Sequence, residues 1–526
     1  YVPTKPFYLL GQHFSAIAAA GPIAGPILAA QMFGWLPCVL WIALGVVFIG
    51  AVHDFSALIA SVRHKAKSVA EIVRQNLGQR AWVAIMAFIW IALIYVIVAF
   101  TDVTAGTFVG KIEELEGTKV NFERGGAVAF SSTAYLLLAM VMGLVQKRFN
   151  PPLWLMTIVF VPATLFIVWL GTKCSTWLLI SGAGGGLHPQ KTWGVIILIY
   201  CLIASLLPVW LLLQPRGYLG GFVLYIVLAV GVIGILFGGF EVQQPAFKGW
   251  VQRDGQGNPT PTGLLFPFLF VTIACGACSG FHGLVCSGTT SKQIARESDC
   301  HAVGYGAMLL EAFVALIALA TVMMVAKTTE GPGVIYAKGI GRFLTVILGP
   351  NAFLFAFIFG SLAFSTFVFD TLDVATRLSR YIVQELFNWH GRTASILSTI
   401  VTVSVPLFFI LSADAPQSGK PPAYMAFWTL FGTSNQLLAG LTLLGITVWL
   451  KRIGKPYWFT LVPMVFVTGI TIWSLAIQSI QAFRLKLGLN PATINGAVCL
   501  CLAGLTAFLV TESVKGLRRP AAPVAG

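Results

Sequence analysis

Long apolar runs, separated by short polar or Gly/Pro-rich stretches, cover almost the whole sequence. Two of them, residues 81–100 and 153–170, reach or approach the roughly 20 residues that an α-helix needs to cross about 30 Å of hydrocarbon. The pattern predicts about 14 membrane segments. They begin near residues 8, 35, 82, 126, 153, 193, 219, 263, 302, 347, 394, 424, 457 and 493. We therefore expect an all-α polytopic membrane protein that forms a single transmembrane domain over residues 1–526.

Composition supports this expectation. Hydrophobic residues make up 57% of the chain and charged residues 10%, and the mean hydropathy is +0.86, whereas a soluble domain carries about a quarter charged residues. The net charge of +15 does not indicate nucleic-acid binding, because the basic residues form short clusters between apolar runs. Phosphate-binding loops, dinucleotide fingerprints, zincin helices and nucleophile elbows are not found, so the sequence favours neither ATP-driven transport nor an enzyme, and no cofactor is expected.

The basic residues favour one orientation. One set of alternate loops contains 20 of the 33 lysines and arginines, and such an excess marks the cytoplasmic side. This set consists of Lys5, Arg63, Lys65, Lys67, Arg74, Arg80, Lys147, Arg148, Arg216, Lys292, Arg296, Arg377, Arg380, Arg392, Lys451, Arg452, Lys455, Lys515, Arg518 and Arg519. Both ends of the chain are then cytoplasmic. The stretch 375–389 carries Arg377, Arg380 and Glu385 at helical spacing, which predicts an amphipathic helix on the cytoplasmic surface.

The first membrane segment, residues 8–31, contains two Gly-Pro pairs near mid-membrane, Gly21-Pro22 and Gly25-Pro26. Proline removes an amide donor and clashes with the preceding turn, and glycine lets the backbone leave helical geometry, so the helix should unwind there. Tight helix packing by small residues is the alternative reading.

The eighth segment, residues 263–287, is also interrupted, by glycines at 276, 280, 283 and 288. In the predicted topology it runs antiparallel to the first. Two broken antiparallel segments indicate a midplane binding site in an inverted-repeat transporter, because non-helical backbone survives in a membrane only against protein or water. The predicted substrate-binding residues are Gly21, Pro22, Gly25, Pro26, Ser279, Gly280, His282, Gly283, Ser287, Thr289 and Thr290. Thr290 is equally compatible with a capping box that includes Gln293.

Five carboxylates lie within or at the ends of apolar segments, where an uncompensated charge at the centre costs on the order of 3 kcal/mol. Each needs a proton, a cation or a partner, so they are candidates for proton coupling: Asp54, Asp102, Glu311, Asp370 and Asp373. Glu311 is also compatible with a structural hydrogen bond, and Asp370 and Asp373 are compatible with a solvated helix end. The pair Asp370 and Asp373, at i and i+3, is compatible with a shared proton or a cation.

The nine cysteines lie mostly in apolar runs and are expected to be buried small hydrophobes. A metal site is compatible with the helical stripe formed by Cys275, Cys278, His282 and Cys286. However, four ligands on one straight helix cannot surround a tetrahedral ion without further ligands from elsewhere. We predict no metal. The amide-rich pair Asn435-Gln436 predicts interhelical hydrogen bonds.

Several of these stretches together resemble the carbon starvation protein A (CstA) family of bacterial membrane transporters. They are the stretches 21–31, 50–55, 275–293, 304–311 and 371–380. The resemblance implies a LeuT-type scaffold, similar to the amino acid/polyamine/organocation superfamily, with a five-plus-five inverted repeat whose first and sixth core helices are broken. Members usually carry further helices before the Tyr-Val-Pro-Thr stretch, so it also implies that N-terminal helices are missing here.

The function implied by the resemblance is proton-coupled uptake of small peptides or pyruvate-like carboxylates across the bacterial inner membrane. In this hypothesis the substrate carboxylate binds at the two breaks, where half-helix amino termini and backbone amides replace its water. A passive channel or a nutrient sensor on the same scaffold is the alternative; the sequence leaves sodium coupling and the number of subunits open.

Overall fold

The structure is a computed structural model that describes residues 5–18, 20–115, 118–180, 187–253, 257–326, 328, 330–413, 423–484 and 491–518. Its first half contains α1 (Pro6–Ile17), α2 (Gly21–Phe33), α3 (Trp35–Gly45), the π-helix η1 (Val46–Gly50), α4 (Ala51–Arg63), α5 (Val69–Leu77), α6 (Gln79–Thr107), the antiparallel strands β1 (Ile112–Leu115) and β2 (Thr118–Phe122), α7 (Arg124–Phe149), α8 (Leu153–Lys173), α9 (Pro189–Leu206) and α10 (Leu213–Phe237).

The second half begins with another antiparallel hairpin, and helices follow to the end of the described chain. Its elements are β3 (Val251–Arg253), β4 (Pro259–Leu264), α11 (Leu265–Thr272), α12 (Ala274–Ala277), α13 (Gly280–Gly288), the 3-10 helix η2 (Thr290–Lys292), the π-helix η3 (His301–Tyr305), α14 (Gly306–Met323), α15 (Pro332–Leu348), the 3-10 helix η4 (Pro350–Ala352), α16 (Phe353–Leu386), α17 (Arg392–Ser412), α18 (Ala423–Arg452), α19 (Trp458–Arg484) and α20 (Pro491–Arg518).

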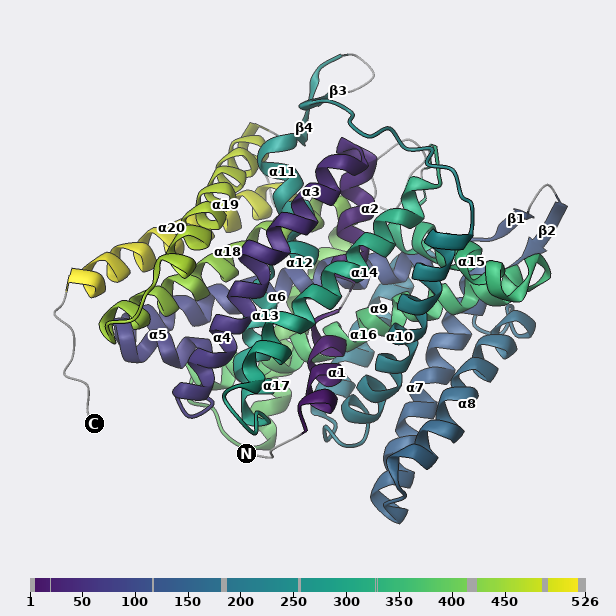
Figure 1. Cartoon of the computed structure of the whole chain (residues 1–526), viewed down its shortest axis with the longest axis horizontal. Helices are drawn as coiled ribbons and strands as arrows, with labels where there is room; N and C mark the ends of the chain where they lie inside the picture. The colour runs from purple at the N-terminus through teal and green to yellow at the C-terminus, as the bar shows by residue number, and fades with distance from the viewer. Residues whose placement is uncertain are drawn as a thin grey trace.

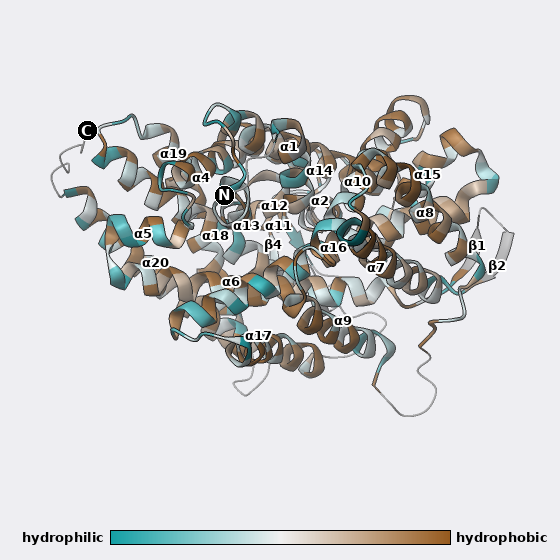
Figure 2. Ribbon diagram, turned by 90° about the horizontal axis from the view of Figure 1, so that it is seen from below, coloured by the Kyte–Doolittle hydropathy of each residue, from teal (hydrophilic) through white to brown (hydrophobic). Residues whose placement is uncertain are grey.

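The described helices confirm a polytopic membrane protein. Twelve of them are long and apolar enough to cross a membrane, and the bent pair α1 and α2 raises the number to as many as 13. Each of the 14 predicted segments overlaps one of these helices or the broken stretch α11 to α13. Figure 2 shows helices that are mostly hydrophobic, with hydrophilic residues gathered in α5 and at helix ends.

The broken helices lie in the middle of the molecule. In Figure 1, α19 and α20 lie at the left and the pair α7 and α8 projects at the lower right, while α2, α12, α13 and α14 are central. α2 packs against α12, α14 and α15, whereas α1 packs against α10 on one side and α13 and α14 on the other. The first half-helix therefore lies between two parts of the core.

The predicted surface helix at 375–389 is corrected by the structure. α16 runs unbroken from Phe353 to Leu386, and Thr376, Ser379 and Arg380 are buried in it. No glycine or proline follows Gly360 in this helix, so nothing interrupts its hydrogen-bond ladder. Its 34 residues span about 51 Å, which exceeds the membrane core.

Arg216 is a second correction, because it was counted among the residues of a cytoplasmic loop. α10 begins at Leu213, Pro215 occupies its first turn, where proline loses no hydrogen bond, and the Arg216 side chain is fully buried. Two helices were not foreseen. α5 is a short amphipathic helix capped by Ser68, whose Oγ accepts from Glu71 N at 3.3 Å, and α15 is the 17-residue helix before α16.

Candidate functional site

The first break lies just before the first Gly-Pro pair. α1 ends at Ile17, Ala18 has non-helical ψ, and α2 begins at Gly21 at an angle of 43° to α1. Pro22 stands in the first turn of α2, where its missing amide would have had no partner. The prediction that the helix unwinds at Gly25-Pro26 is therefore wrong, since the carbonyl that Pro26 leaves unpaired belongs to Pro22 and the helix continues to Phe33.

The second break confirms the interruption predicted for the eighth segment. α12 ends at Ala277, and Cys278 and Ser279 are extended, with φ of −163° and −126°. The backbone also departs from helical geometry at Ile273, which separates α11 from α12. α13 then begins at Gly280, so the segment has a half-helix amino terminus in the middle of the protein.

The broken segments touch each other, and small residues make this possible. A Cβ on Gly21 would lie 2.3 Å from Cys275 Sγ, and one on Gly25 would lie 2.6 Å from the carbonyl oxygen of Thr272. Both distances are far below van der Waals contact. The tight-packing reading of these glycines is thus correct for Gly21 and Gly25, and it brings the two breaks side by side.

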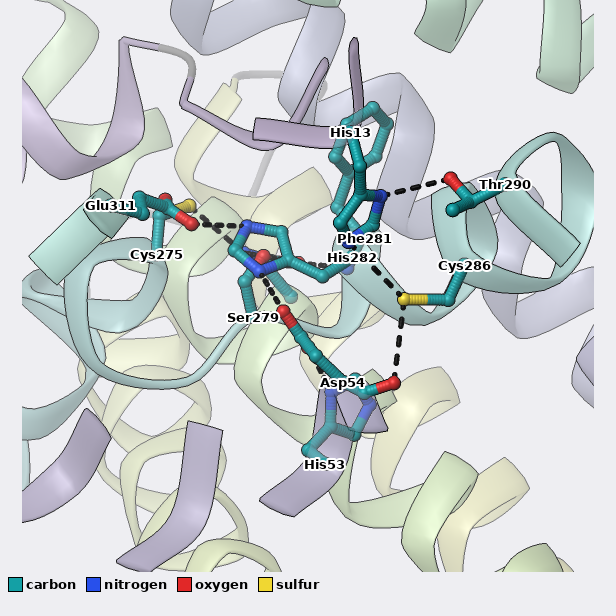
Figure 3. A network of polar contacts seen from close by, with 11 residues as sticks. His13, His53, Asp54, Cys275, Ser279, Phe281, His282, Cys286, Thr290 and Glu311 are labelled. Atoms are coloured by element: carbon teal, nitrogen blue, oxygen red, sulfur yellow. Dashed lines mark hydrogen bonds and ion pairs between the residues drawn. The ribbon is translucent and has the colours of Figure 1, made fainter. Parts of the chain in front are cut away.

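A buried chain of titratable side chains crosses the region beside the second break (Figure 3). His282 of α13 lies between Asp54 of α4 and Glu311 of α14. His282 Nδ1 is 2.9 Å from Asp54 Oδ2, and His282 Nε2 is 3.1 Å from Glu311 Oε2. His53 extends the chain, with Nδ1 2.7 Å from Asp54 Oδ1. None of the four side chains is more than 1% exposed.

The hydrogen-bonding capacity of His282 has a chemical consequence. Both ring nitrogens face carboxylate oxygens, which only accept when ionised, and a neutral imidazole has one N–H. The arrangement is satisfied either by an imidazolium that donates to both carboxylates or by a carboxylic acid that donates to the ring. The two arrangements contain the same number of protons, so the trio Asp54, His282 and Glu311 can pass a proton between the ring and a carboxylate without changing its contacts.

α1 is joined to the same region through His13. His13 Nδ1 lies 2.9 Å from Thr290 Oγ1, and His13 Nε2 lies 3.7 Å from Cys286 Sγ. Cys286 also donates to the backbone carbonyl of Asp54, at 3.5 Å. Thr290 thus binds His13 and does not act as the helix cap that its spacing to Gln293 suggested.

Asn435 of α18 holds the second break in place. Its Oδ1 accepts from the backbone amide of Phe281 at 2.9 Å, and its Nδ2 donates to Ser279 Oγ at 3.0 Å and to Cys275 Sγ at 3.2 Å. The interhelical hydrogen bonds expected of the amide-rich pair are confirmed for Asn435. A Cβ on Gly280 would lie 2.4 Å from the carbonyl oxygen of Asn435, so α13 and α18 are in direct contact there.

The remaining predicted site residues have other surroundings. Gly283 packs under the His53 ring, which would lie 3.2 Å from a Cβ at that position. Ser287 Oγ accepts from the amide of Val69 at 3.2 Å and so anchors α5. Thr289 is exposed and donates to Val285 O of its own helix. Asp102 accepts from Gln190 at 2.9 Å, away from the breaks.

Asp370 and Asp373 form a second buried cluster with Arg216, which sequence reasoning placed in a loop. Arg216 Nε donates to Asp370 Oδ1 at 2.6 Å, and Nη1 pairs with Asp373 Oδ2. Tyr200 Oη accepts from the same Nη1 at 2.6 Å and donates to Asp373 Oδ2 at 2.8 Å. The available signal was Pro215, which predicts that a helix begins there and that Arg216 lies inside it.

The stripe of Cys275, Cys278, His282 and Cys286 does not converge. In the described part of the chain, no group of three or more His, Cys, Asp or Glu side chains is arranged to hold a metal ion. Cys275 contacts Asn435, whereas Cys286 contacts His13 and the Asp54 carbonyl. These residues do not fit a metal centre.

An exposed ion pair lies at the carboxyl end of α4. Arg63 Nη2 lies 2.5 Å from Glu297 Oε1 in the stretch before α14. The hydrogen bond from Arg63 holds the pKa of Glu297 below its usual range. The pair joins α4, which contributes Asp54 to the buried chain, to the stretch that leads through η3 into α14, which contributes Glu311.

Comparison with known proteins identifies the family. The model of the family described as carbon starvation protein CstA matches residues 1–331 and 324–474. The peptide transporter CstA of Campylobacter jejuni is 33% identical, over 92% of this chain and 74% of that protein. The chain belongs to the CstA family.

Another relative in this family has a different substrate in its name. The pyruvate/proton symporter BtsT of Escherichia coli is 30% identical, over 91% of this chain and 75% of that protein. A Helicobacter pylori protein named peptide transporter CstA is 32% identical, over 90% of this chain and 74% of that protein. These relatives are named as transporters and not as enzymes.

Solved structures show the fold. A manganese transporter of Eremococcus coleocola superposes with a TM-score of 0.50 at 13% identity and covers 98% of both chains. MhsT in complex with L-phenylalanine also superposes with a TM-score of 0.50, at 12% identity, and the match covers 97% of this chain and 98% of that one. The CstA-family chain therefore has the LeuT-type fold, as the resemblance to this family implied.

Proposed function

We propose that this protein takes up small peptides or pyruvate-like carboxylates across the bacterial inner membrane by proton symport. The observation that carries the proposal is the pairing of two broken spans with a buried His-carboxylate chain beside the second break. The names of the relatives, peptide transporter and pyruvate/proton symporter, support the substrate class and the coupling ion.

In this proposal the substrate carboxylate binds between the amino termini of α2 and α13. These half-helix ends carry partial positive charge, and Gly21 at the start of α2 packs on Cys275 of α12, the helix that precedes the second break. Ser279 and His282 supply polar contacts at the second break. The backbone around this site is shaped by Gly280, Gly283, Gly25, Pro22 and Pro26. Ser287 and Thr290 hold α5 and α1 against it. Thr289, the exposed member of the predicted set, would be a peripheral contact.

The transported proton is carried by the chain of Asp54, His282 and Glu311. Loading a proton on this chain removes one uncompensated charge from the protein interior, and an intramembrane charge is costly. Because His282 also faces the second break, protonation and substrate binding act on the same side chain. Candidates for additional proton sites are Asp370, Asp373 and Asp102. We also propose that both ends of the chain lie on the cytoplasmic side of the membrane.

The test is uptake by purified protein in proteoliposomes. An inward gradient of about 2 pH units supplies about 2.7 kcal/mol per proton, enough for about 100-fold accumulation of substrate. Labelled pyruvate and a panel of di- and tripeptides are offered under a proton gradient and, separately, under a sodium gradient. Accumulation above the external concentration under the proton gradient alone supports symport.

Three other results contradict the proposal. Flux without accumulation or saturation indicates a channel, binding without flux indicates a sensor, and accumulation only under a sodium gradient reverses the choice of ion. Empty liposomes and liposomes treated with a protonophore serve as controls.

A further inference from the structure

The Arg216 cluster shares no residue with the chain of Asp54, His282 and Glu311. Arg216 lies on α10, Asp370 and Asp373 lie on α16, Tyr200 lies on α9, and Tyr135 of α7 donates to the Arg216 carbonyl at 3.0 Å. α1 packs on α10 and α16 on this side and on α13 and α14 on the other. The Arg216 side chain is fully buried, and Asp370 and Asp373 are 7% and 1% exposed.

The cluster contains more acceptors than its one cation uses. Two carboxylates face a single guanidinium, so the ionised cluster has a net charge of −1. Three of its buried atoms have no hydrogen-bonding partner among the described residues: Asp370 Oδ2, Asp373 Oδ1 and the donor Arg216 Nη2. The next arginine on α16, Arg377, donates to the carbonyls of Ala204 and Leu207 and not to this pair.

The ligand atoms around the guanidinium are those of a hard cation site. Carboxylate and hydroxyl oxygens are preferred by Na⁺-like and Ca²⁺-like ions. Here such oxygens surround the guanidinium of Arg216 and come from Asp370, Asp373 and Tyr200. The Nε and Nη1 atoms of Arg216 stand where these oxygens would otherwise bind a metal cation. Asp370 Oδ2 and the Tyr135 hydroxyl also approach one point, since both lie within 4 Å of a Cβ built on Gly220.

We propose that Arg216 is a tethered counter-cation that fills a cation site between α10 and α16, so that this protein needs no bound sodium to complete its core. The permanent charge balances one carboxylate, and the second carboxylate is left for a single proton. Removing the guanidinium, with its bulk and its charge, should leave two carboxylates and a tyrosine hydroxyl around an open space. Such a space should bind a metal cation.

The first experiment measures cation binding by thermal unfolding of detergent-purified protein, which requires no transport. Unfolding midpoints are compared in NaCl, CaCl₂ and choline chloride at matched ionic strength for wild type, Arg216→Ala and Arg216→Lys. We expect no cation-specific shift for wild type or Arg216→Lys, because a tethered cation remains. For Arg216→Ala we expect NaCl or CaCl₂ to raise the midpoint by at least ~2 °C over choline chloride.

The second experiment uses the same proteins in proteoliposomes, and only this half rests on the proton symport proposed above. Uptake by wild type and Arg216→Lys should be equal in sodium and choline media, whereas uptake by Arg216→Ala should rise at least threefold with sodium. If wild type shows no uptake, the proposed function fails. The unfolding experiment still tests the proposed cation site, because it does not depend on transport.

A cation-specific shift in wild type overturns the proposal, as does folded Arg216→Ala with equal midpoints in all three salts. If Arg216→Ala does not fold, Arg216→Gln carries the same prediction, because its amide still donates to Asp370 while the charge is gone. The triple variant Arg216→Ala/Asp370→Asn/Asp373→Asn removes the proposed ligands and should lose the cation response.

Discussion

At the scale of single residues, the proposed proton exchange involves side chains that face one another from different helices. His282 has a carboxylate at each ring nitrogen, and Glu311 is completely buried in an apolar helix. A buried carboxylate persists only with a partner or a proton. Glu311 Oε2 lies 3.1 Å from His282 Nε2, but neither carboxylate oxygen of Glu311 has a hydrogen bond among the described residues. It is thus the least satisfied member of the chain.

Replacing Glu311 by Gln keeps the size of the side chain and removes its proton-binding capacity. We expect the accumulation ratio under an inward pH gradient to fall at least tenfold, which corresponds to about 1.4 kcal/mol of lost coupling. Exchange of labelled for unlabelled substrate, which needs no net proton movement, should persist. Uptake and exchange in proteoliposomes measure both.

The matched control is Glu512→Gln, because Glu512 pairs with Lys515 near the end of α20, and a pair of this kind contributes little. Unchanged coupling in Glu311→Gln would remove this residue from the proton path.

Asn435 sets the geometry of the second break through one amide group. In Asn435→Ala, the buried amide of Phe281 loses its acceptor, which costs about 1–3 kcal/mol. We expect a lower unfolding midpoint, measured by thermal unfolding in detergent. Gln436→Leu is the control, since the Gln436 carbonyl oxygen has no hydrogen bond among the described residues. Equal midpoints for the two variants would contradict the role given to Asn435.

At the scale of elements, the site depends on how closely α2 approaches α11 and α12. The backbone of α2 touches Cys275 at Gly21 and the Thr272 carbonyl at Gly25. A second close approach joins η1 to α12, where a Cβ on Gly50 would lie 2.2 Å from the Ala277 carbonyl oxygen. Breaks that are displaced by even one methyl group would no longer face the same space.

Gly21→Ala should therefore separate the two breaks. Overpacking of this kind costs about 1–3 kcal/mol, and we expect a lower unfolding midpoint together with loss of uptake. Cys275→Gly in the same protein removes the atoms that clash and should restore part of both. The control is Gly469→Ala in α19, where a Cβ meets no atom within 4 Å. Normal uptake by Gly21→Ala alone would contradict this reading.

At the scale of the whole molecule, the structure is closed around the buried chain. His13, His53, Asp54, His282 and Glu311 are each at most 1% exposed, so neither proton nor substrate reaches them without a rearrangement. α1 is the half-helix bound to this region mainly through His13, and its other face donates from Ser15 to the Gly217 carbonyl at 3.2 Å. Alternating access requires such contacts to be made and broken during each cycle.

Cys286 reports this rearrangement because its thiol is buried beside His13 and Asp54. In a protein whose other eight cysteines are replaced by serine or alanine, we expect slow reaction with N-ethylmaleimide at rest. Substrate together with a proton gradient should change the rate at least threefold. Cys501, which is exposed, serves as the single-cysteine control and should react at the same rate in all conditions. A Cys286 rate that never changes would contradict access to the site by this route.

The sequence by itself determined the membrane class, the positions of the 14 segments, the two interrupted spans and the family. These properties depend on local composition and periodicity, since an apolar run of membrane length, a Gly-Pro pair or a conserved-looking motif is read along a continuous stretch of chain. It also selected the carboxylates Asp54 and Glu311, because a charge within an apolar run stands out in one dimension.

Only the tertiary structure decided which of these groups meet. The pairing of His282 with Asp54 and Glu311 joins residues 228 positions apart and on three helices, and Arg216 meets Asp370 across 154 positions. The same holds for α16, whose basic residues look like a surface stripe in sequence but are covered by neighbouring helices. Periodicity records which face of a helix is polar, whereas the packing of the other helices determines whether that face meets water, lipid or an opposite charge.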